Sequence, residues 1–376
     1  MMKYVSTSKF RTCKDYLENR MKCGQTKLLV FFFSLVLASI SCSSQLKEFN
    51  SVVFTPDGNY VVSGSNDGMA RVWEAKTGVL RYTLKGHTNE ISDVAVSPDG
   101  TIIATGSLDR TAIFWNANSG EEVYAFKPEP ITRITPNNKK IVSDIVIHSI
   151  AFSTDGKWFA AATRPNVIHI WDVQTKELIK ILETPTLPSD PTNGTTPYGV
   201  EFSADGKYIS GFAWAGVTGP FMWRTDTFEL TWFELNYDIQ AIAPNPRDGS
   251  LGVSVDKGNN VIGILDLDNK RTVMEWEANT YQTASRALAY SHDGNLIALG
   301  DYDKIFTLWN ANTGEAIPIE VQPPAFKADS SSTSSSIIPT SIAISPDMTQ
   351  VAVAGNYGVL GVWDAQTGTL LWQFDN

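Results

Sequence analysis

The chain has 376 residues, of which 43% are hydrophobic and 11% aromatic, enough apolar material for one large buried core. Its formal net charge is −10. Residues 1–42 hold seven of the 30 Lys and Arg but two of the 40 Asp and Glu, so the remainder carries −15. Such an acidic surface repels nucleic-acid phosphates and anionic lipid headgroups, which argues against nucleic acid as a partner.

The N-terminal 42 residues have the pattern of an export signal. An apolar run, Leu28–Ile40, follows Lys22 and Lys27; it is short for a membrane-spanning helix but typical of a signal-peptide core. The run ends at Ser39-Ile40-Ser41-Cys42, which resembles a bacterial lipoprotein processing site with Ser39 where Leu is usual. We therefore expect a signal peptide or lipoprotein signal, lipidation at Cys42, and a location in the cell envelope or membrane-anchored outside the cytoplasm.

Three alternatives remain open for this run: a buried helix, an uncleaved anchor, and a signal cleaved without lipidation. A signal peptide of ordinary length would begin at Met21, so residues 1–20 are hypothesised to be dispensable, which N-terminal sequencing tests. The only cysteines are Cys13, Cys23 and Cys42. The rest of the chain therefore has neither disulfides nor thiolate metal ligands.

From residue 49 onward, a tight turn containing Asp recurs seven times. About sixteen residues after each turn Asp stands a position that is Trp in six of the seven cases. A fixed spacing of this kind indicates an internal repeat. The turn residues are Asp57, Asp99, Asp155, Asp205, Asp248, Asp293 and Asp347, and the paired positions are Trp73, Trp115, Trp171, Trp223, Leu265, Trp309 and Trp363.

Each repeat is predicted to form four short antiparallel strands. In the first repeat these are residues 52–54, 60–62, 70–73 and 79–84, separated by turns rich in Asp, Asn and Gly. One such sheet cannot bury both of its faces alone. Stacking the sheets radially solves this and leaves few open edges, which is the architecture of a propeller.

The second repeat carries the clearest resemblance to a known family. Its Lys85-Gly86-His87, Ser97-Pro98-Asp99-Gly100 and Trp115-Asn116 stand where the WD-repeat family has its signature. The resemblance covers roughly residues 49–374 and implies an all-β, seven-bladed β-propeller of four-stranded antiparallel blades. It also implies a hydrogen-bonded network inside the blade, made by His87, Thr105, Asp109 and Trp115.

The other repeats depart from this set. Trp171-Asp172 and Trp363-Asp364 keep the family dipeptide, whereas the fifth repeat has Leu265-Asp266. We expect divergent blades held mainly by packing. The expected organisation is a signal region (1–42), a short tether (43–48) and the propeller (49–376). The propeller is expected to begin at an inner strand and end at an outer one, with no strand exchange between its first and last blades.

A search for an active site is mostly negative. The histidines, His87, His148, His169 and His292, show no metal-ligand spacing, and the recurrent Asp residues are explained by their turns. No phosphate-binding loop or nucleophile elbow is present. We expect no catalytic role, no metal and no cofactor.

Function is expected in three long insertions between repeats, residues 127–147, 183–197 and 321–339. Each joins an outer strand to the next inner strand, and the family resemblance places all three on one face. The first contains Arg133, Lys139 and Lys140, interpreted either as a solvated loop or as a docking point for an acidic partner. The second is rich in Pro, Thr and Ser, and the third contains a serine-rich linker, residues 330–336.

Two further features are candidate contacts for a partner. Trp214 lies in an unusual turn, where it is either buried under the loop or an exposed anchor. Polar residues also recur at one register of the inner strands and predict a ring at the channel mouth, the alternative being ordinary polarity at strand entry. The ring consists of Asn50, Ser92, His148, Tyr198, Gln240, Arg286 and Thr340.

These observations favour a monomeric, non-catalytic scaffold that binds a protein or peptide on the face with the insertions. The expected membrane contact is limited to the N-terminal lipid or signal anchor. The alternative is a propeller hydrolase or lyase acting on an extracellular carbohydrate or small molecule. A cluster of carboxylates with His148 at the channel mouth would favour that alternative.

Overall fold

The computed structural model describes residues 47–129, 131–134, 140–143, 145–164, 166–187, 190–194, 196–213, 220–232, 238–256, 260–278, 287–302, 304–324 and 337–374. The predicted signal region with Cys42 and most of the tether lie outside these residues, as do Lys139, Trp214 and Arg286. For Arg133 and Lys140 the backbone is described and the side chain is not. None of the helices within the described ranges is long and apolar enough to cross a membrane.

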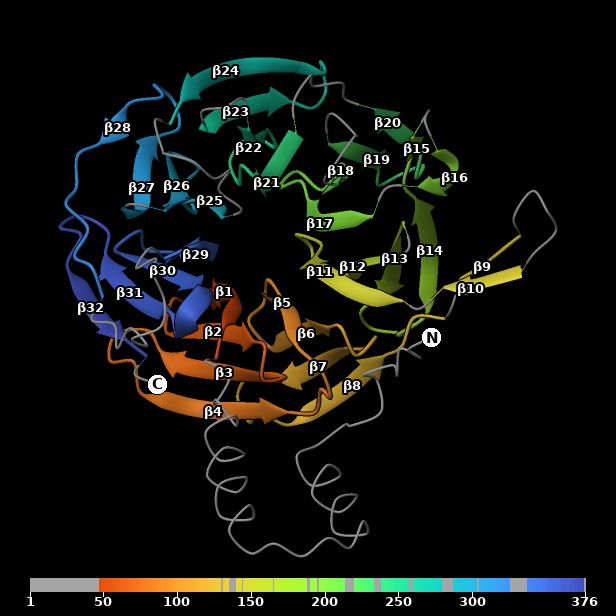
Figure 1. Ribbon diagram of the computed structural model, residues 1–376, viewed down its shortest axis with the longest axis horizontal. Coiled ribbons are helices and arrows are strands. Elements are labelled where there is room, and N and C mark those ends of the chain that lie inside the picture. The colour runs from red at the N-terminus through yellow and green to blue at the C-terminus, as the bar shows by residue number, and fades with distance from the viewer. Residues whose placement is uncertain are drawn as a thin grey trace, which may run out of the picture. The chain divides into compact units, whose positions relative to one another are not determined.

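Seven four-stranded antiparallel sheets surround a central channel, each built from four consecutive strands (Figure 1). The predicted seven-bladed propeller is therefore confirmed. Blade 1 is β1 (Phe49–Phe54), β2 (Tyr60–Ser65), β3 (Met69–Glu74) and β4 (Leu80–Lys85); blade 2 is β5 (Ile91–Val96), β6 (Ile102–Ser107), β7 (Ala112–Asn116) and β8 (Glu122–Phe126); blade 3 is β11 (Val146–Phe152), β12 (Trp158–Arg164), β13 (Val167–Asp172) and β14 (Leu178–Glu183).

The remaining blades follow the same order from channel to rim. Blade 4 is β17 (Pro197–Phe202), β18 (Tyr208–Ala213), β19 (Phe221–Arg224) and β20 (Leu230–Trp232); blade 5 is β21 (Asp238–Pro244), β22 (Leu251–Asp256), β23 (Asn260–Asp266) and β24 (Arg271–Glu277); blade 6 is β25 (Leu288–Tyr290), β26 (Leu296–Asp301), β27 (Ile305–Asn310) and β28 (Ala316–Ile317); blade 7 is β29 (Pro339–Ile344), β30 (Gln350–Gly355), the 3-10 turn η1 (Asn356–Gly358), β31 (Leu360–Asp364) and β32 (Leu370–Gln373).

The recurrent Asp residues build the turn between the first two strands of each blade. In blade 2, Ser97 Oγ and the Thr101 amide donate to Asp99 Oδ1 at 2.6 and 3.0 Å, and Gly100 takes a φ of 71° that favours glycine. Hydrogen bonds from Ser97 and Thr101 lower the pKa of Asp99. Five other blades repeat both contacts, at Asp57, Asp155, Asp205, Asp293 and Asp347.

Apolar side chains pack between neighbouring blades. One cluster joins Phe114 and Phe126 of blade 2 to Phe159 and Trp171 of blade 3, with Phe114 and Phe159 edge to face at 4.8 Å. The repeat tryptophans and Leu265 are all buried. Packing between blades therefore holds the blades that lack the polar network.

The ring closes without strand exchange among the described residues, as predicted. Blade 7 supplies its own outer strand, β32, and the chain enters blade 1 at its inner strand, β1. Closure depends on packing and on hydrogen bonds between blades 7 and 1, of which the outermost comes from Trp372. Trp372 Nε1 donates to Ala75 O at 2.7 Å, and Phe374 lies edge to face with Phe49 and Trp73 at centroid distances of 5.2 and 5.6 Å.

Two of the three insertions contain hairpins that the sequence analysis did not predict. β9 (Ile131–Ile134) pairs with β10 (Lys140–Ser143), and β15 (Thr186–Leu187) pairs with β16 (Asp190–Gly194). The first hairpin extends outward beyond β14 (Figure 1). Its Ile, Thr and Val residues favour strands, a preference masked in the sequence by the neighbouring Pro, Asn and Lys.

Candidate binding site in the central channel

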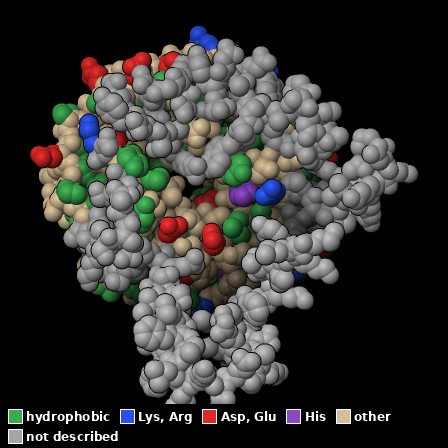
Figure 2. Space-filling model, viewed as in Figure 1, with side chains coloured by type: hydrophobic (Ala, Val, Ile, Leu, Met, Phe, Trp, Pro, Cys, Tyr) green, Lys and Arg blue, Asp and Glu red, His purple; other side chains and the backbone are tan. Residues whose placement is uncertain are grey.

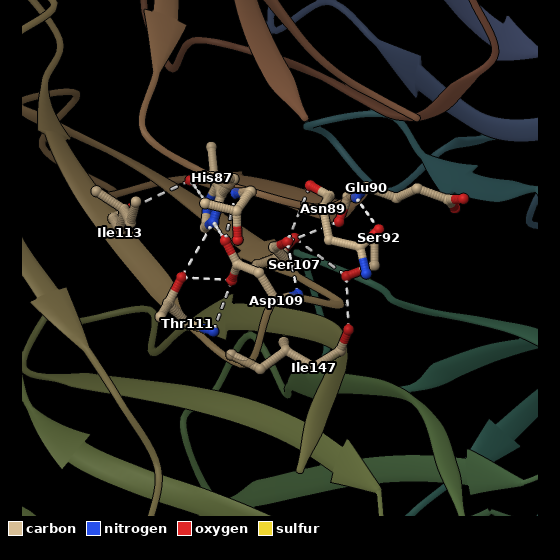
Figure 3. A network of polar contacts seen from close by, with 12 residues as sticks. His87, Asn89, Glu90, Ser92, Ser107, Asp109, Thr111, Ile113 and Ile147 are labelled. Carbon is tan, nitrogen blue, oxygen red and sulfur yellow. Dashed lines mark hydrogen bonds and ion pairs between the residues drawn. The ribbon is translucent and has the colours of Figure 1, made fainter. Parts of the chain in front are cut away.

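The hydrogen-bonded network implied by the family resemblance lies inside blade 2, and Figure 3 shows His87 and Asp109 with Thr111 beside them. His87 contacts Asp109 Oδ2 through Nδ1 at 2.9 Å and Thr105 Oγ1 through Nε2 at 2.7 Å, and Trp115 Nε1 donates to Thr105 Oγ1 at 2.9 Å. Burial alone would raise the pKa of Asp109, but hydrogen bonds from His87, Thr111 and the Thr88 amide hold it well below its usual range. The network is structural and joins β6, β7 and the turn between them with the segment before β5.

Other blades keep fragments of this network. In blade 1, Trp73 Nε1 donates to Ser63 Oγ at 2.9 Å, but no histidine takes part. In blade 3, His169 stacks on Trp171 at 5.3 Å, and burial lowers the pKa of His169 to about 4. A neutral, buried His169 agrees with the structural role expected for it.

The predicted polar ring coincides with a bulge at the start of the inner strands. Asn50 is the extra residue between Phe49 and Ser51 in the pairing of β1 with β2. The other described members occupy the same bulge: Ser92, His148, Tyr198, Gln240 and Thr340. All of them except Gln240 line a cavity of about 190 Å³ at the mouth of the channel. Bulges of this kind redirect a side chain out of the sheet.

Three members of the ring connect neighbouring blades and are not free for a ligand. Asn50 Nδ2 donates to Ile91 O at 2.8 Å, and Ser92 Oγ donates to Ile147 O at 2.7 Å. Thr340 Oγ1 donates to the carbonyl of the first residue of β1 at 2.7 Å. Asn50, Ser92 and Thr340 therefore have a structural role and are not part of a ligand-binding ring.

His148 and Tyr198 form an aromatic pair at the mouth. Their ring centroids lie 4.8 Å apart. Burial first, and then the positive charge of Arg164, lower the pKa of His148 to about 4, so its imidazole is neutral at pH 7. The buried Nε2 atom of His148 has no hydrogen-bond partner among the described residues. These two side chains are the members of the described ring best placed for recognition.

A second layer, one residue further into the channel, links blades through side-chain acceptors. The Ile150 amide donates to Asp93 Oδ2 at 2.9 Å, and the Val200 amide donates to Ser149 Oγ at 3.2 Å. Ser341 and Ser51 accept the amides of Val52 and Val94 in the same way. At this position blades 4, 5 and 6 have Gly199, Ala241 and Ala287, which offer no side-chain acceptor.

Sequence reasoning missed the two carboxylates in the channel, Asp93 and Glu201. Both line the mouth cavity and also the cavity of about 510 Å³ that continues toward the opposite face. Burial, and then the charge of Asp93, raise the pKa of Glu201 to about 8. Burial also raises the pKa of Asp93, against hydrogen bonds from the Ile150 amide and Ser51. Carboxylate side chains and a histidine border the hollow at the centre of the molecule in Figure 2.

Glu201 stands out when the seven inner strands are aligned at one position. Two residues beyond the second layer, the inner strands carry alanine in five blades and valine in one. Glu201 is the one charged residue at this position, whose other members are Val53, Ala95, Ala151, Ala243, Ala289 and Ala343.

The chemistry of this site is that of polar recognition. Within the described part of the chain, no group of three His, Cys, Asp or Glu side chains could hold a metal ion. Both oxygens of Asp93 already accept hydrogen bonds, from Ser51 and two backbone amides. Glu201 and His148 therefore remain as the groups that can respond to a ligand, and Tyr198 packs against His148.

Seven radial four-stranded blades with a His-Thr-Asp-Trp network define a WD-type β-propeller. Comparison with known families agrees: the WD40 model (WD domain, G-beta repeat) matches residues 38–74, 78–116 and 130–172. The chain is thus a seven-bladed β-propeller whose first three repeats match WD40 repeats.

Similar proteins share part of their length with this chain. Apoptotic protease-activating factor 1 of Rattus norvegicus is 25% identical over 362 residues, covering 87% of this chain and 26% of that protein. The nuclear distribution proteins nudF of Aspergillus flavus and Aspergillus oryzae are each 28% identical over 144 residues, covering 37% of this chain and 28% of theirs. The alignments therefore span little more than a quarter of each relative.

Proposed function

We infer that this chain is a non-catalytic WD-repeat scaffold that binds a protein or peptide at the channel mouth, on the face with the long insertions. The observation that carries this inference is where the insertions end. The first leads into β11 just before His148, and the second leads into β17 just before Tyr198. The two insertions thus flank the aromatic pair that lines the mouth cavity, and recognition loops on a rigid scaffold are the usual arrangement for binding.

Site-specific photo-crosslinking tests this proposal. A photoreactive residue is placed at Tyr198, and in a matched control at His292, which lies in the cavity that opens toward the opposite face. The proposal expects one partner to be captured from position 198 and to be lost when a peptide from that partner is added in excess. Capture of that partner from position 292 alone would contradict it.

The first insertion is proposed to add electrostatic attraction for an acidic partner. Arg133, Lys139 and Lys140 lie in or beside the β9–β10 hairpin of an acidic chain. Their contribution would weaken as salt rises from about 0.05 to 0.5 M, because the Debye length falls from roughly 14 to 4 Å. Salt-insensitive binding that survives deletion of residues 127–140 would remove this hairpin from the interface. Trp214 and Arg286 also remain proposed contacts.

One observation favours the alternative of a hydrolase or lyase. Asp93, Glu201 and His148 line one cavity, and a carboxyl group with a raised pKa is a feature of many general acids. Against this, Asp93 is occupied by hydrogen bonds within the protein. Hydrolysis of chromogenic glycosides that disappears in Glu201→Gln would support the alternative over the scaffold.

Export and tethering are proposed from the sequence of residues 28–42. The apolar run and the cysteine that follows it support a signal with lipidation at Cys42. Intact-mass analysis of the mature protein would show an acylated Cys42 as the first residue, and Cys42→Ala would release the protein from membranes. An N-terminus upstream of Cys42 without lipid would exclude this part of the proposal.

A further inference from the structure

Blade 4 carries a polar pair where the other blades are apolar. Glu201 on β17 lies directly opposite Ser210 on β18. Directly opposite residues of an antiparallel pair share one face, with Cβ atoms about 5 Å apart. The equivalent pairs are Val53 with Val62, Ala95 with Ala104, Ala151 with Ala160, Ala243 with Gly252, Ala289 with Ala298, and Ala343 with Ala352.

Neither member of this pair is satisfied within the described residues. Ser210 is 1% exposed, and its Oγ has no hydrogen-bond partner there. Glu201 is partly buried in the channel wall, and no hydrogen bond joins it to the described residues. Buried polar groups are nearly always paired, because leaving one unpaired costs about 1–3 kcal/mol, and more for a charge. Ser210 lines neither channel cavity, whereas Glu201 lines both, so Glu201 is the group that a ligand in the channel can complete.

The surroundings favour a positive ligand. No Lys or Arg of the described ranges is among the residues that line either cavity, and Asp93 adds a second carboxylate beside Glu201. His148 at the mouth is neutral at pH 7, and Arg164 lies exposed at the end of β12. The mouth cavity of about 190 Å³ has room for several water-sized groups, since one water needs roughly 10–15 Å³.

The geometry favours an ammonium over a guanidinium group. An Arg fork requires two parallel acceptors, whereas the oxygens of Asp93 already accept from Ser51, Val94 and Ile150. A single carboxylate suits the compact ammonium group of lysine. That group sits on a slender apolar stem, which suits a channel wall made mostly of alanine.

We propose that the channel receives the side chain of a lysine from the bound peptide, whose ammonium group pairs with Glu201. This inference rests on the proposed function, because it places one residue of the peptide bound at the mouth. The peptide backbone lies at the His148–Tyr198 pair, and the lysine side chain extends inward from there.

The first test uses n-butylammonium chloride, which reproduces the end of a lysine side chain. It is expected to raise the melting temperature of the full chain, whereas n-butanol and sodium chloride at the same concentrations are not. Glu201→Ala should weaken apparent affinity at least tenfold. This variant introduces the residue that most other blades carry, so it is expected to fold. Glu177→Gln, an exposed carboxylate on blade 3, is the matched control and should respond like the natural chain.

Two results would overturn the ammonium site: a response of Glu201→Ala equal to that of the natural chain, or an equal effect of n-butanol. The lysine assignment has its own test with N-acetyl-lysine N-methylamide. This probe should bind more tightly than butylammonium, and Tyr198→Ala should remove that advantage. Equal affinity of the two probes would assign the site to a free amine and overturn the peptide part of the inference.

The outcomes also separate this inference from the proposed function. A partner captured at position 198 that binds Glu201→Ala as tightly as the natural chain would overturn the lysine site and leave the scaffold function intact. Amine binding that depends on Glu201, combined with a partner captured from the opposite face alone, would support the amine site and contradict the proposed binding of the partner at the channel mouth.

Discussion

Glu201 shows how one residue can set the character of a channel. Six of the seven equivalent positions are alanine or valine, so Glu201 adds an ionisable group to an otherwise apolar layer. Burial and the neighbouring Asp93 raise its pKa to about 8. The folded chain therefore holds a proton that the unfolded chain has released at neutral pH, and folding is opposed by that difference.

The first prediction is a pH-dependent cost of Glu201. Because the folded pKa lies above the ordinary value of 4.5, stability falls as pH rises from about 4.5 through about 8 and is then constant. The melting temperature of Glu201→Ala should match that of the natural chain near pH 5 and exceed it increasingly up to pH 9. Asp93, His148 and His169 titrate in both proteins and cancel in the difference. A difference that stays constant with pH would refute a raised pKa at Glu201.

At the scale of elements, the blades divide into one with a complete polar network and six held mainly by packing. In blade 2, Thr105 accepts from Trp115 and contacts His87, so one hydroxyl connects the strands to the segment before β5. The hydrogen bond from Trp73 to Ser63 shows that the contact between the repeat tryptophan and a strand hydroxyl persists in a blade without the histidine. The network therefore adds to the packing of one blade and is not required by the architecture.

The second prediction concerns this network. Trp115→Ala should lower the free energy of unfolding by about 3–5 kcal/mol through the cavity it leaves and the hydroxyl it strands. Thr105→Val keeps the shape and should cost about 1–3 kcal/mol. Urea unfolding measures both.

If Trp214 is an exposed contact, Trp214→Ala should scarcely change the melting temperature. A loss of stability equal to that of Trp115→Ala would remove Trp214 from the candidate contacts.

Sequence periodicity predicted the blades because each turn depends on local chemistry, such as Asp99 with Ser97 and Gly100. It predicted the register of the channel mouth for the same reason, since the bulge residues stand at a fixed distance from the turn. It did not predict that Asn50, Ser92 and Thr340 would be occupied by carbonyls of the next blade, because those contacts cross between repeats. Glu201 was missed because a single charge in a strand carries no periodic signal.

At the scale of the whole molecule, closure of the ring depends on side chains at the two ends of the propeller. Trp372 and Phe374 of the last blade pack on Phe49 and Trp73 of the first, and Trp372 also donates to Ala75 O. In the described chain no strand is shared between these blades. The seam between blades 7 and 1 is therefore held by packing and by side-chain hydrogen bonds, as between the other blades.

The third prediction follows from this seam. Trp372→Ala should lower the free energy of unfolding by about 3–5 kcal/mol, a loss typical of a packed tryptophan. Hydrogen exchange should rise first in β1 and β32, because the ring would open at its seam. Leu371→Ala is the matched control, since Leu371 is 43% exposed on the same strand. Faster exchange spread evenly over all seven blades would argue against a seam held by Trp372.

The central claim is that recognition occurs at the channel mouth, and the affinity of the captured partner for two variants tests it most directly. Tyr198→Ala alters the mouth, whereas Asp293→Asn alters a turn on the opposite face that accepts hydrogen bonds from Ser291 and Asn295. Titration calorimetry at a temperature where both variants are folded should show a loss of about 1–3 kcal/mol for Tyr198→Ala and none for Asp293→Asn. Full affinity in Tyr198→Ala with lost affinity in Asp293→Asn would contradict the account.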